Sequence, residues 1–106
     1  MTPEKMKLAF VFWAPGADPK KHRAVISLDT MDFHVVAVPD YDQAVEISRN
    51  LVKQGVSAIE LCGGFGNLGI AKVAEAVKGT LVGAVKFDSC PPLGGKSGDQ
   101  FFGLCP

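Results

Sequence analysis

Short, mostly apolar runs recur along this chain and predict four strands. They cover residues 7–13, 33–39, 57–63 and 81–88. Apolar residues are nearly continuous within these runs, which is typical of strands that are buried on both faces of a sheet. We therefore predict that each run forms one strand of a buried sheet.

The segments between these runs carry helix signals. Asp18 is a suitable N-cap and Pro19 suits a first helical turn, which predicts a short helix over 19–27. Asp40 is followed three residues later by Gln43, which is the spacing of a capping box with Asp in place of Ser or Thr. A second helix is therefore predicted directly after the second strand.

Helical periodicity predicts a third helix that begins near Asn67. Its apolar residues Ile70, Val73, Ala74 and Val77 fall at positions i, i+3, i+4 and i+7. Strands that alternate with helices predict parallel pairing and right-handed crossovers. The expected fold is a single small α/β domain over 1–106, with a four-stranded, mainly parallel sheet in the order 2-1-3-4 and helices on its faces.

The end of the chain changes character. Residues 89–106 are rich in Gly and Pro and are predicted to form an irregular tail. Phe101 and Phe102 are too apolar to remain in water, so we expect them to pack on the domain or on another subunit. The stretch "LGGKSGD" imitates the end of a nucleotide-binding loop, but a glycine-rich tail is the better interpretation.

Composition and charge narrow the possible partners. Of 106 residues, 47% are hydrophobic, and Lys plus Arg equals Asp plus Glu at 11 each. Without a basic excess or a charged tail, neither nucleic acid nor a membrane surface is an expected partner. A net charge of zero permits self-association, so a homo-oligomer is expected. The longest apolar run is Leu8 to Ala14, too short to span a bilayer, and we interpret it as the first strand of a cytoplasmic protein.

The three cysteines, Cys62, Cys90 and Cys105, favour a reducing compartment. They cannot all pair within one chain, and none lies in a C-x-x-C motif. A bridge between Cys90 and Cys105 remains an alternative. Two His and three scattered Cys show no metal-site spacing, so no metal is expected, and no pattern identifies a cofactor.

The most suggestive motif is Gly64-Phe65-Gly66-Asn67-Leu68-Gly69, a G-x-G-x-x-G between a predicted strand and a predicted helix. Free amides at a helix start attract anions, and glycine permits both a positive φ and a close approach. An acidic residue follows 19 positions after Gly69, as in dinucleotide-binding proteins, although this chain lacks the second half that would hold a dinucleotide. The alternative is a close-packed turn without a ligand. Candidate ligand-binding residues are Gly16, Arg23, Gly63, Gly64, Phe65, Gly66, Asn67, Lys86 and Asp88.

Glu60, Cys62 and His22 are the candidate catalytic residues. Strand alternation places Glu60 and Cys62 on one face, and Glu60 is expected to be mostly buried and within ion-pair reach of Lys86 or another cation. The simpler interpretation is a structural ion pair for Glu60 and a small apolar packing role for Cys62. The catalytic hypothesis makes Glu60 a general acid or base and Cys62 a nucleophile near a helix start. In a 2-1-3-4 sheet, His22 and Arg23 would face the glycine loop across the crevice at the strand ends.

The combination of "APGADPKKHR", "AIELCGGFG" and "KFD…LGGKSGD" resembles a small bacterial family known only as a domain of unknown function. The likeness covers nearly the whole chain, including the tail. It implies hallmark residues but no activity. These residues are Gly16, Asp18, His22, Arg23, Glu60, Cys62, Gly63, Gly64 and Gly66.

Three functions are consistent with these patterns. The first is binding of a small anionic metabolite at the glycine loop. The second is a small isomerase or hydrolase that uses Cys62 or Glu60 with His22. The third is a non-catalytic assembly protein whose glycines serve only packing, which is favoured if Phe65 or the tail fills the crevice.

Overall fold

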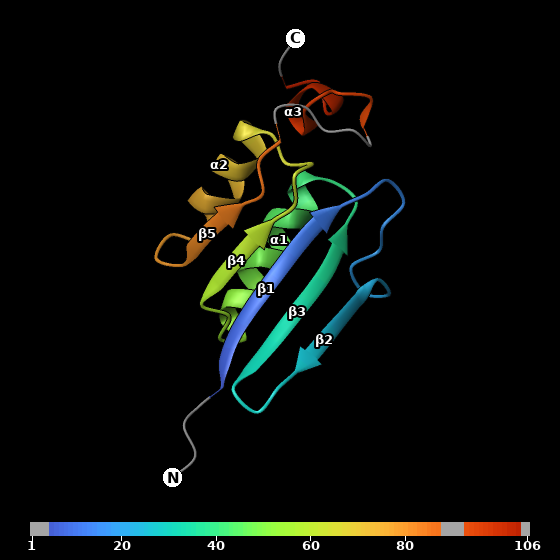
Figure 1. Cartoon of the computed structure of the whole chain (residues 1–106). Coiled ribbons are helices and arrows are strands. Elements are labelled where there is room, and N and C mark those ends of the chain that lie inside the picture. Colours follow the sequence, from blue (N-terminus) through green and yellow to red (C-terminus); the bar gives the residue numbers. More distant parts are fainter. Residues whose placement is uncertain (1–4, 88–92, 105–106) are drawn as a thin grey trace.

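The computed structural model describes residues 5–87 and 93–104, and in these ranges it contains one five-stranded sheet and three helices. The strands are β1 (Met6–Trp13), β2 (Arg23–Ser27), β3 (Met31–Val38), β4 (Ala58–Leu61) and β5 (Leu81–Ala84). The helices are α1 (Tyr41–Lys53), α2 (Asn67–Ala76) and α3 (Gly98–Phe101). Figure 1 shows α1 and α2 behind the sheet and the short α3 beyond one end of it.

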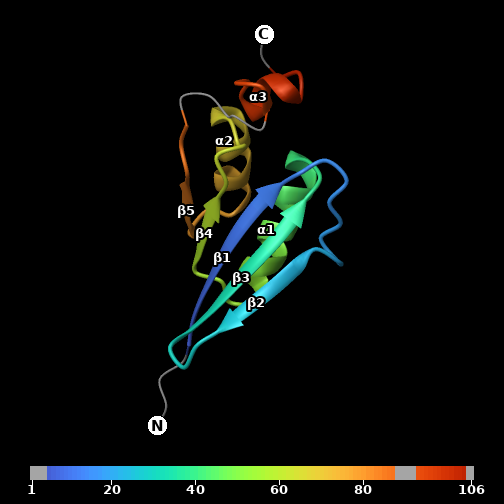
Figure 2. The ribbon, with the colours of Figure 1, turned by 45° about the vertical axis from the view of Figure 1, so that its right-hand side comes forward.

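The sheet order is β2-β3-β1-β4-β5, and all pairs are parallel except β2 with β3. The prediction of four strands is therefore wrong, and the overall order differs from the expected one. The four predicted strands correspond to β1, β3, β4 and β5, which do lie as 2-1-3-4 relative to one another. The difference is the additional edge strand β2, visible at the margin of the sheet in Figure 2.

The helix predicted over 19–27 does not form. The Asp18 carboxylate accepts from the Lys20 amide at 2.9 Å, and the Asp18 carbonyl accepts from the His22 amide at 2.7 Å, which closes one tight turn. The chain then extends into β2 and pairs antiparallel with β3. The capping signal at Asp18 is satisfied by this turn alone, and β-branched residues such as Val25 suit the following strand.

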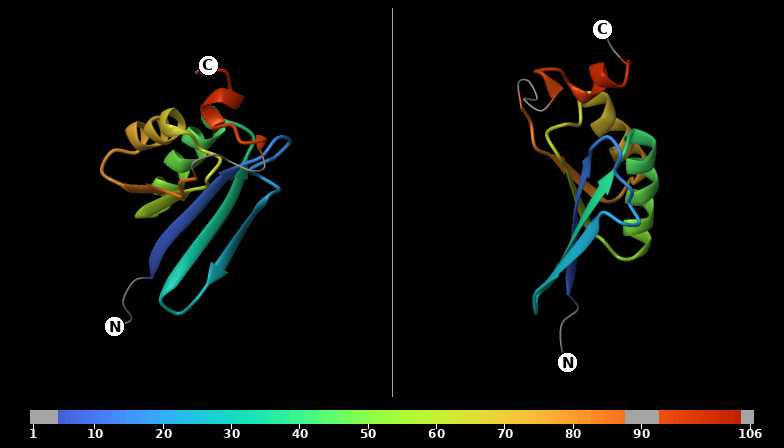
Figure 3. Two further views of the ribbon diagram at one scale, coloured as in Figure 1. Left: turned by 45° about the horizontal axis from the view of Figure 1, so that its top comes forward. Right: turned by 90° about the vertical axis from the view of Figure 1, so that its right-hand side faces the viewer.

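This change leaves one face of the sheet without a helix among the described residues. The chain crosses from β3 to β4 through α1 and from β4 to β5 through α2, in the same direction across the sheet. Right-handed crossovers in one direction place both helices on the same face. A helix over 19–27 would have crossed back from β1 to β3 on the opposite face. In the side view of Figure 3, α1 lies on one side of the strands, so the prediction of helices on both faces is wrong for the described residues.

The hydrophobic core lies between the sheet and these two helices. Alternate residues of each strand point into it, and the helices contribute an apolar stripe, as the pattern of 3.6 residues per turn requires. The Asp40 cap predicted for α1 is confirmed, because its side chain accepts from the Gln43 amide at 2.8 Å. Core residues include Ala9, Val11, Trp13, Val36, Val38, Leu51, Ile59, Leu61 and Val73.

We call the other side of the sheet the open face. Because side chains alternate along a strand, the residues between the core positions point to this side. They are apolar except for one carboxylate. They are Met6, Leu8, Phe10 and Phe12 of β1, Ala24 and Ile26 of β2, Met31, Phe33, Val35 and Ala37 of β3, Ala58 and Glu60 of β4, and Leu81 and Gly83 of β5.

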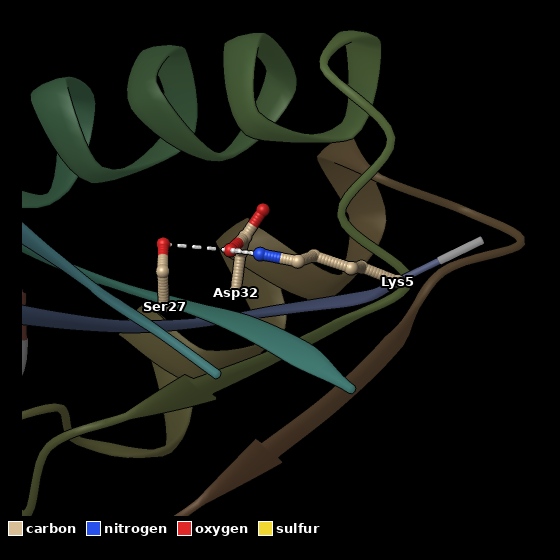
Figure 4. Close-up of polar contacts among 3 residues, drawn as sticks. All are labelled: Lys5, Ser27 and Asp32. Carbon is tan, nitrogen blue, oxygen red and sulfur yellow. Dashed lines mark hydrogen bonds and ion pairs between the residues drawn. The ribbon is translucent and has the colours of Figure 1, made fainter. Parts of the chain in front are cut away.

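A cluster of polar side chains forms hydrogen bonds between strands at the end of the sheet that is farthest from α3. One oxygen of Asp32 accepts hydrogen bonds from Ser27 Oγ at 2.8 Å and Lys5 Nζ at 3.2 Å, as shown in Figure 4. The hydrogen bond from Ser27 and then that from Lys5 lower the pKa of Asp32. The cluster links β2 and the start of β1 to β3.

Candidate functional site

A cavity of about 730 Å³ lies where β1 and β4 end, and we call it the apolar cavity. The two strands are parallel neighbours, so their carboxyl ends meet at the same edge of the sheet. In open α/β sheets this edge is the usual place for ligands. The lining residues are Phe10, Phe12, Trp13, Ala14, Pro15, Cys62, Gly63, Gly64, Phe87, Leu93 and Phe101.

Trp13 joins the sheet to the C-terminal segment 93–104 at this cavity. Its indole nitrogen donates to the Gly64 carbonyl at 2.7 Å, and its ring packs against Phe101 and Phe102 at centroid distances of 5.1 and 4.6 Å. Both phenylalanines therefore contact the domain, which was one of the two expected alternatives, and Phe101 remains 49% exposed. The Phe87 ring occupies the space that a Cβ at position 63 would need, and Gly63 leaves this space free. The cavity is therefore built from three parts of the chain that are distant in sequence.

The amides of the glycine loop contact an anion that belongs to the chain itself. Asp99 is 95% buried, and its carboxylate accepts from the Leu68 amide at 2.8 Å and from the Gly69 amide at 3.1 Å. Both amides belong to the first turn of α2, which carries a partial positive charge. Asp99 thus caps α2 from 30 residues away and occupies the position where the sequence suggested an external anion.

Tyr41 completes this contact. Its hydroxyl donates to Asp99 at 2.9 Å and accepts from the Gly66 amide at 3.0 Å. Burial raises the pKa of the Tyr41 phenol, and the nearby carboxylate raises it further, so the hydroxyl keeps its proton. We call the contacts of Asp99 with Tyr41, Leu68 and Gly69 the tail anchor.

The loop glycines are needed for space rather than for unusual backbone angles. Neither Gly64 nor Gly66 has a positive φ. The need for a positive φ, which the motif suggested, therefore does not explain these two glycines. A Cβ on Gly66 would overlap the Asp99 carboxylate, and one on Gly69 would overlap the Tyr41 ring. The motif therefore accommodates the C-terminal segment closely against the start of α2.

Several predicted ligand residues have structural contacts instead. Phe65 is buried in the core and stacks on Tyr41 with a centroid distance of 5.3 Å. The prediction that a helix begins near Asn67 is confirmed, but Gly66 is the N-cap and the Asn67 side chain accepts from Lys86 Nζ at 2.9 Å. Of the predicted residues, the apolar cavity brings together Cys62, Gly63 and Gly64.

Glu60 is exposed on the open face, so the prediction of a buried ion pair with Lys86 is wrong. The pairing register puts Glu60 between Phe10 and Gly83, whereas Lys86 is hydrogen-bonded to Asn67 at the start of α2. The alternation argument identified the correct face. The error was the assumption that a helix covers that face.

His22 and Arg23 are exposed and do not line the apolar cavity. The His22 carbonyl bonds the Ala37 amide at the edge of the sheet, so His22 lies about three strand spacings, roughly 14 Å, from Cys62. Gly16 occupies a turn with φ +81° and also lies outside the lining. Asp88, Cys90 and Cys105 fall outside the described residues, so the Asp88 prediction and the Cys90–Cys105 alternative have no structural counterpart here.

Sequence reasoning missed Asp99, although one signal for its helix was present. Ser97 and Gln100 have the S-x-x-Q spacing of a capping box, and both reciprocal hydrogen bonds form at the start of α3. The resemblance of this stretch to a nucleotide loop obscured that signal.

The described part of the chain contains no group of three or more His, Cys, Asp or Glu side chains suited to holding a metal ion. In the same residues, no helix has both the length and the apolar character to cross a membrane.

Fold and site define a single-domain α/β protein with a two-layer architecture, a half-covered sheet and an apolar cavity at its carboxyl edge. The chain belongs to a family of unknown function, DUF6506, which matches residues 6–100. No curated protein and no solved structure shows significant similarity to it.

Proposed function

We propose that this protein binds a small, mainly apolar organic molecule in the apolar cavity. The observation that carries the proposal is the combination of size and lining. A volume of about 730 Å³ is within the range of about 300–1,000 Å³ that small-molecule sites occupy. Every lining residue that the structure describes is uncharged, and most are aromatic or aliphatic, which suits a flat or hydrophobic ligand.

The lining offers few polar contacts. Trp13 already donates its indole N–H to Gly64, so Cys62 supplies the remaining polar side-chain atom among the described residues of the lining. Its thiol is free and partly exposed. A ligand held here would be recognised mainly through shape and ring contacts, with the thiol as one weak polar partner.

The anionic ligand favoured by the sequence is a weaker candidate. An external phosphate or carboxylate on the glycine loop would have to displace Asp99 from the amides of Leu68 and Gly69. The enzyme hypothesis is also weaker, because the separation of His22 from Cys62 prevents the nucleophile–base pair that such catalysis needs. A larger groove of about 780 Å³ between α1 and α2 is lined mainly by exposed charged side chains, which is typical of a solvated helix surface.

The single tryptophan allows a direct test, because Trp13 lines the cavity. Titration with the uncharged apolar dye N-phenyl-1-naphthylamine should quench Trp13 fluorescence in a saturable manner with one dye per chain. Ala14→Phe places a ring in the cavity and should abolish the effect. The matched control Ala71→Phe adds the same ring to the exposed surface of α2 and should leave binding unchanged.

A second readout uses the thiol. In a Cys90→Ser/Cys105→Ser background, Cys62 is the one remaining cysteine, and bound dye should slow its reaction with a thiol reagent. Dye binding that does not saturate would contradict the proposal. Equal dye binding by Ala14→Phe and Ala71→Phe would contradict it as well.

A further inference from the structure

The open face carries a continuous apolar row across all five strands. Strand pairing aligns Ile26, Phe33, Leu8, Ala58 and Leu81 from one edge of the sheet to the other. The two ends of the row are exposed, Ile26 by 59% and Leu81 by 75%. Single exposed apolar residues are common on protein surfaces, but a connected row of this length marks an interaction site.

The neighbouring row shows how little charge the open face holds. It contains Ala24, Val35, Phe10, Glu60 and Gly83, and Glu60 is the one charged side chain among the described residues of the face. Sheets that are mostly parallel normally have both faces covered. Here the covering helix is missing because β2 takes its place in the chain.

The margins of the open face carry exposed apolar side chains. Met6 is 54%, Ile26 59% and Leu81 75% exposed. A sheet with an apolar face normally buries that face against another layer. We infer that a second copy of this chain covers the open face, with the two sheets packed face to face.

A second copy suits this surface better than a different partner. In a two-fold dimer the same patch meets itself and must therefore complement itself, which an apolar surface with little charge can do. A partner chosen by charge would need a complementary group, and among the described residues of the open face Glu60 is the one that offers it. The C-terminal segment is not the cover, because the tail anchor holds Asp99 against α2 and Phe102 packs on Trp13 and Tyr41.

This inference does not rest on the ligand proposal, although the two surfaces touch. Phe10 and Phe12 belong to the open face and also line the apolar cavity. A second copy on this face would therefore border the cavity. The tests remain separate, because association is measured without any dye.

Sedimentation equilibrium of the full chain should give a mass twice that of the 11.2 kDa monomer. Ile26→Glu and Leu81→Glu each put a carboxylate at one end of the apolar row, and each should weaken association by about 100-fold. Leu68→Glu is the matched control, since Leu68 is a 46% exposed apolar residue on α2. It should leave association unchanged. Circular dichroism would verify that all three variants remain folded.

The outcomes discriminate between surfaces. A monomer at every concentration would overturn the inference. If Ile26→Glu weakens association and Leu81→Glu does not, the copies pair through the β2 edge. If all three variants weaken association equally, the copies associate through another surface. Either result would also overturn the inference.

Discussion

Replacing Asp99 by Asn tests the tail anchor with almost no change in shape. The carboxylate accepts three hydrogen bonds, from the amides of Leu68 and Gly69 and from the Tyr41 hydroxyl, and it lies at the start of α2. In Asp99→Asn, one oxygen becomes an NH₂ group that cannot accept, so at least one of these donors loses its partner. The variant also removes the negative charge from the helix terminus.

The magnitude follows from these two losses. A hydrogen bond to a charged group contributes about 1.5–3 kcal/mol, and a charge at a helix start contributes about 0.3–1 kcal/mol. We therefore expect Asp99→Asn to lower the free energy of unfolding by about 2–4 kcal/mol. In a domain of this size, about 1 kcal/mol shifts Tm by roughly 4–8 °C, so a decrease of at least about 8 °C is expected.

Two measurements report this loss. Urea unfolding gives the free energy, and the emission of Trp13 reports whether Phe101 and Phe102 still cover it. A red shift before global unfolding is expected in Asp99→Asn. The control Glu75→Gln removes an exposed carboxylate whose ion pair with Lys78 lies at the surface, and it should change stability by less than about 0.5 kcal/mol. A loss in Asp99→Asn no larger than in this control would refute the reasoning.

Further predictions concern the same anchor and the far end of the sheet. Gly66→Ala should destabilise the protein and red-shift Trp13 as Asp99→Asn does, because its Cβ would overlap the carboxylate, and native-like fluorescence would contradict this. Asp99→Ala should gain thermal stability from added acetate or phosphate while wild type does not, and an equal gain in both would instead support an external anion site. Asp32→Asn should destabilise the protein at pH 6. Because the folded-state pKa of Asp32 is lowered, the difference from wild type should disappear as pH falls below 3.8, and a constant difference in Tm would contradict the assignment.

Much of the sheet and of α1 and α2 was predictable because the signals are local. The apolar runs marked four strands, Asp40 and Gln43 marked the start of α1, and the spacing from Ile70 marked α2. These patterns depend on residues within one or two turns of each other. The relative order of the four predicted strands followed from connection rules that hold for most α/β proteins.

The edge strand β2 was not predictable from the same signals. Asp18 and Pro19 look like a helix start, and the stretch 23–27 is too short to show a clear period. Its extended state depends on β3, which offers a free edge only once the sheet has formed. A local cap signal therefore gave the wrong element, because the deciding partner comes from strand pairing.

The role of the glycine loop was also out of reach of local reasoning. The motif identified a strand-to-helix turn, but the group that satisfies its amides is Asp99, 30 residues after Gly69. A capping residue normally precedes its helix, so no spacing rule searches that far downstream. An internal carboxylate and an external anion would require the same sequence motif. Both need backbone without side chains near Gly66 and Gly69, so that they can approach the amides.

One change of connection accounts for both the exposed surface and the location of the candidate site. If residues 19–27 formed a crossover helix, that helix would cover Phe10 and Phe12 and remove the side of the apolar cavity that they line. Because the segment joins the sheet edge instead, the carboxyl ends of β1 and β4 stay accessible from the open face, and the C-terminal segment closes the remaining side through Trp13. Forcing this helix back, by a helix-favouring replacement of 23–27, should therefore reduce self-association and dye binding together.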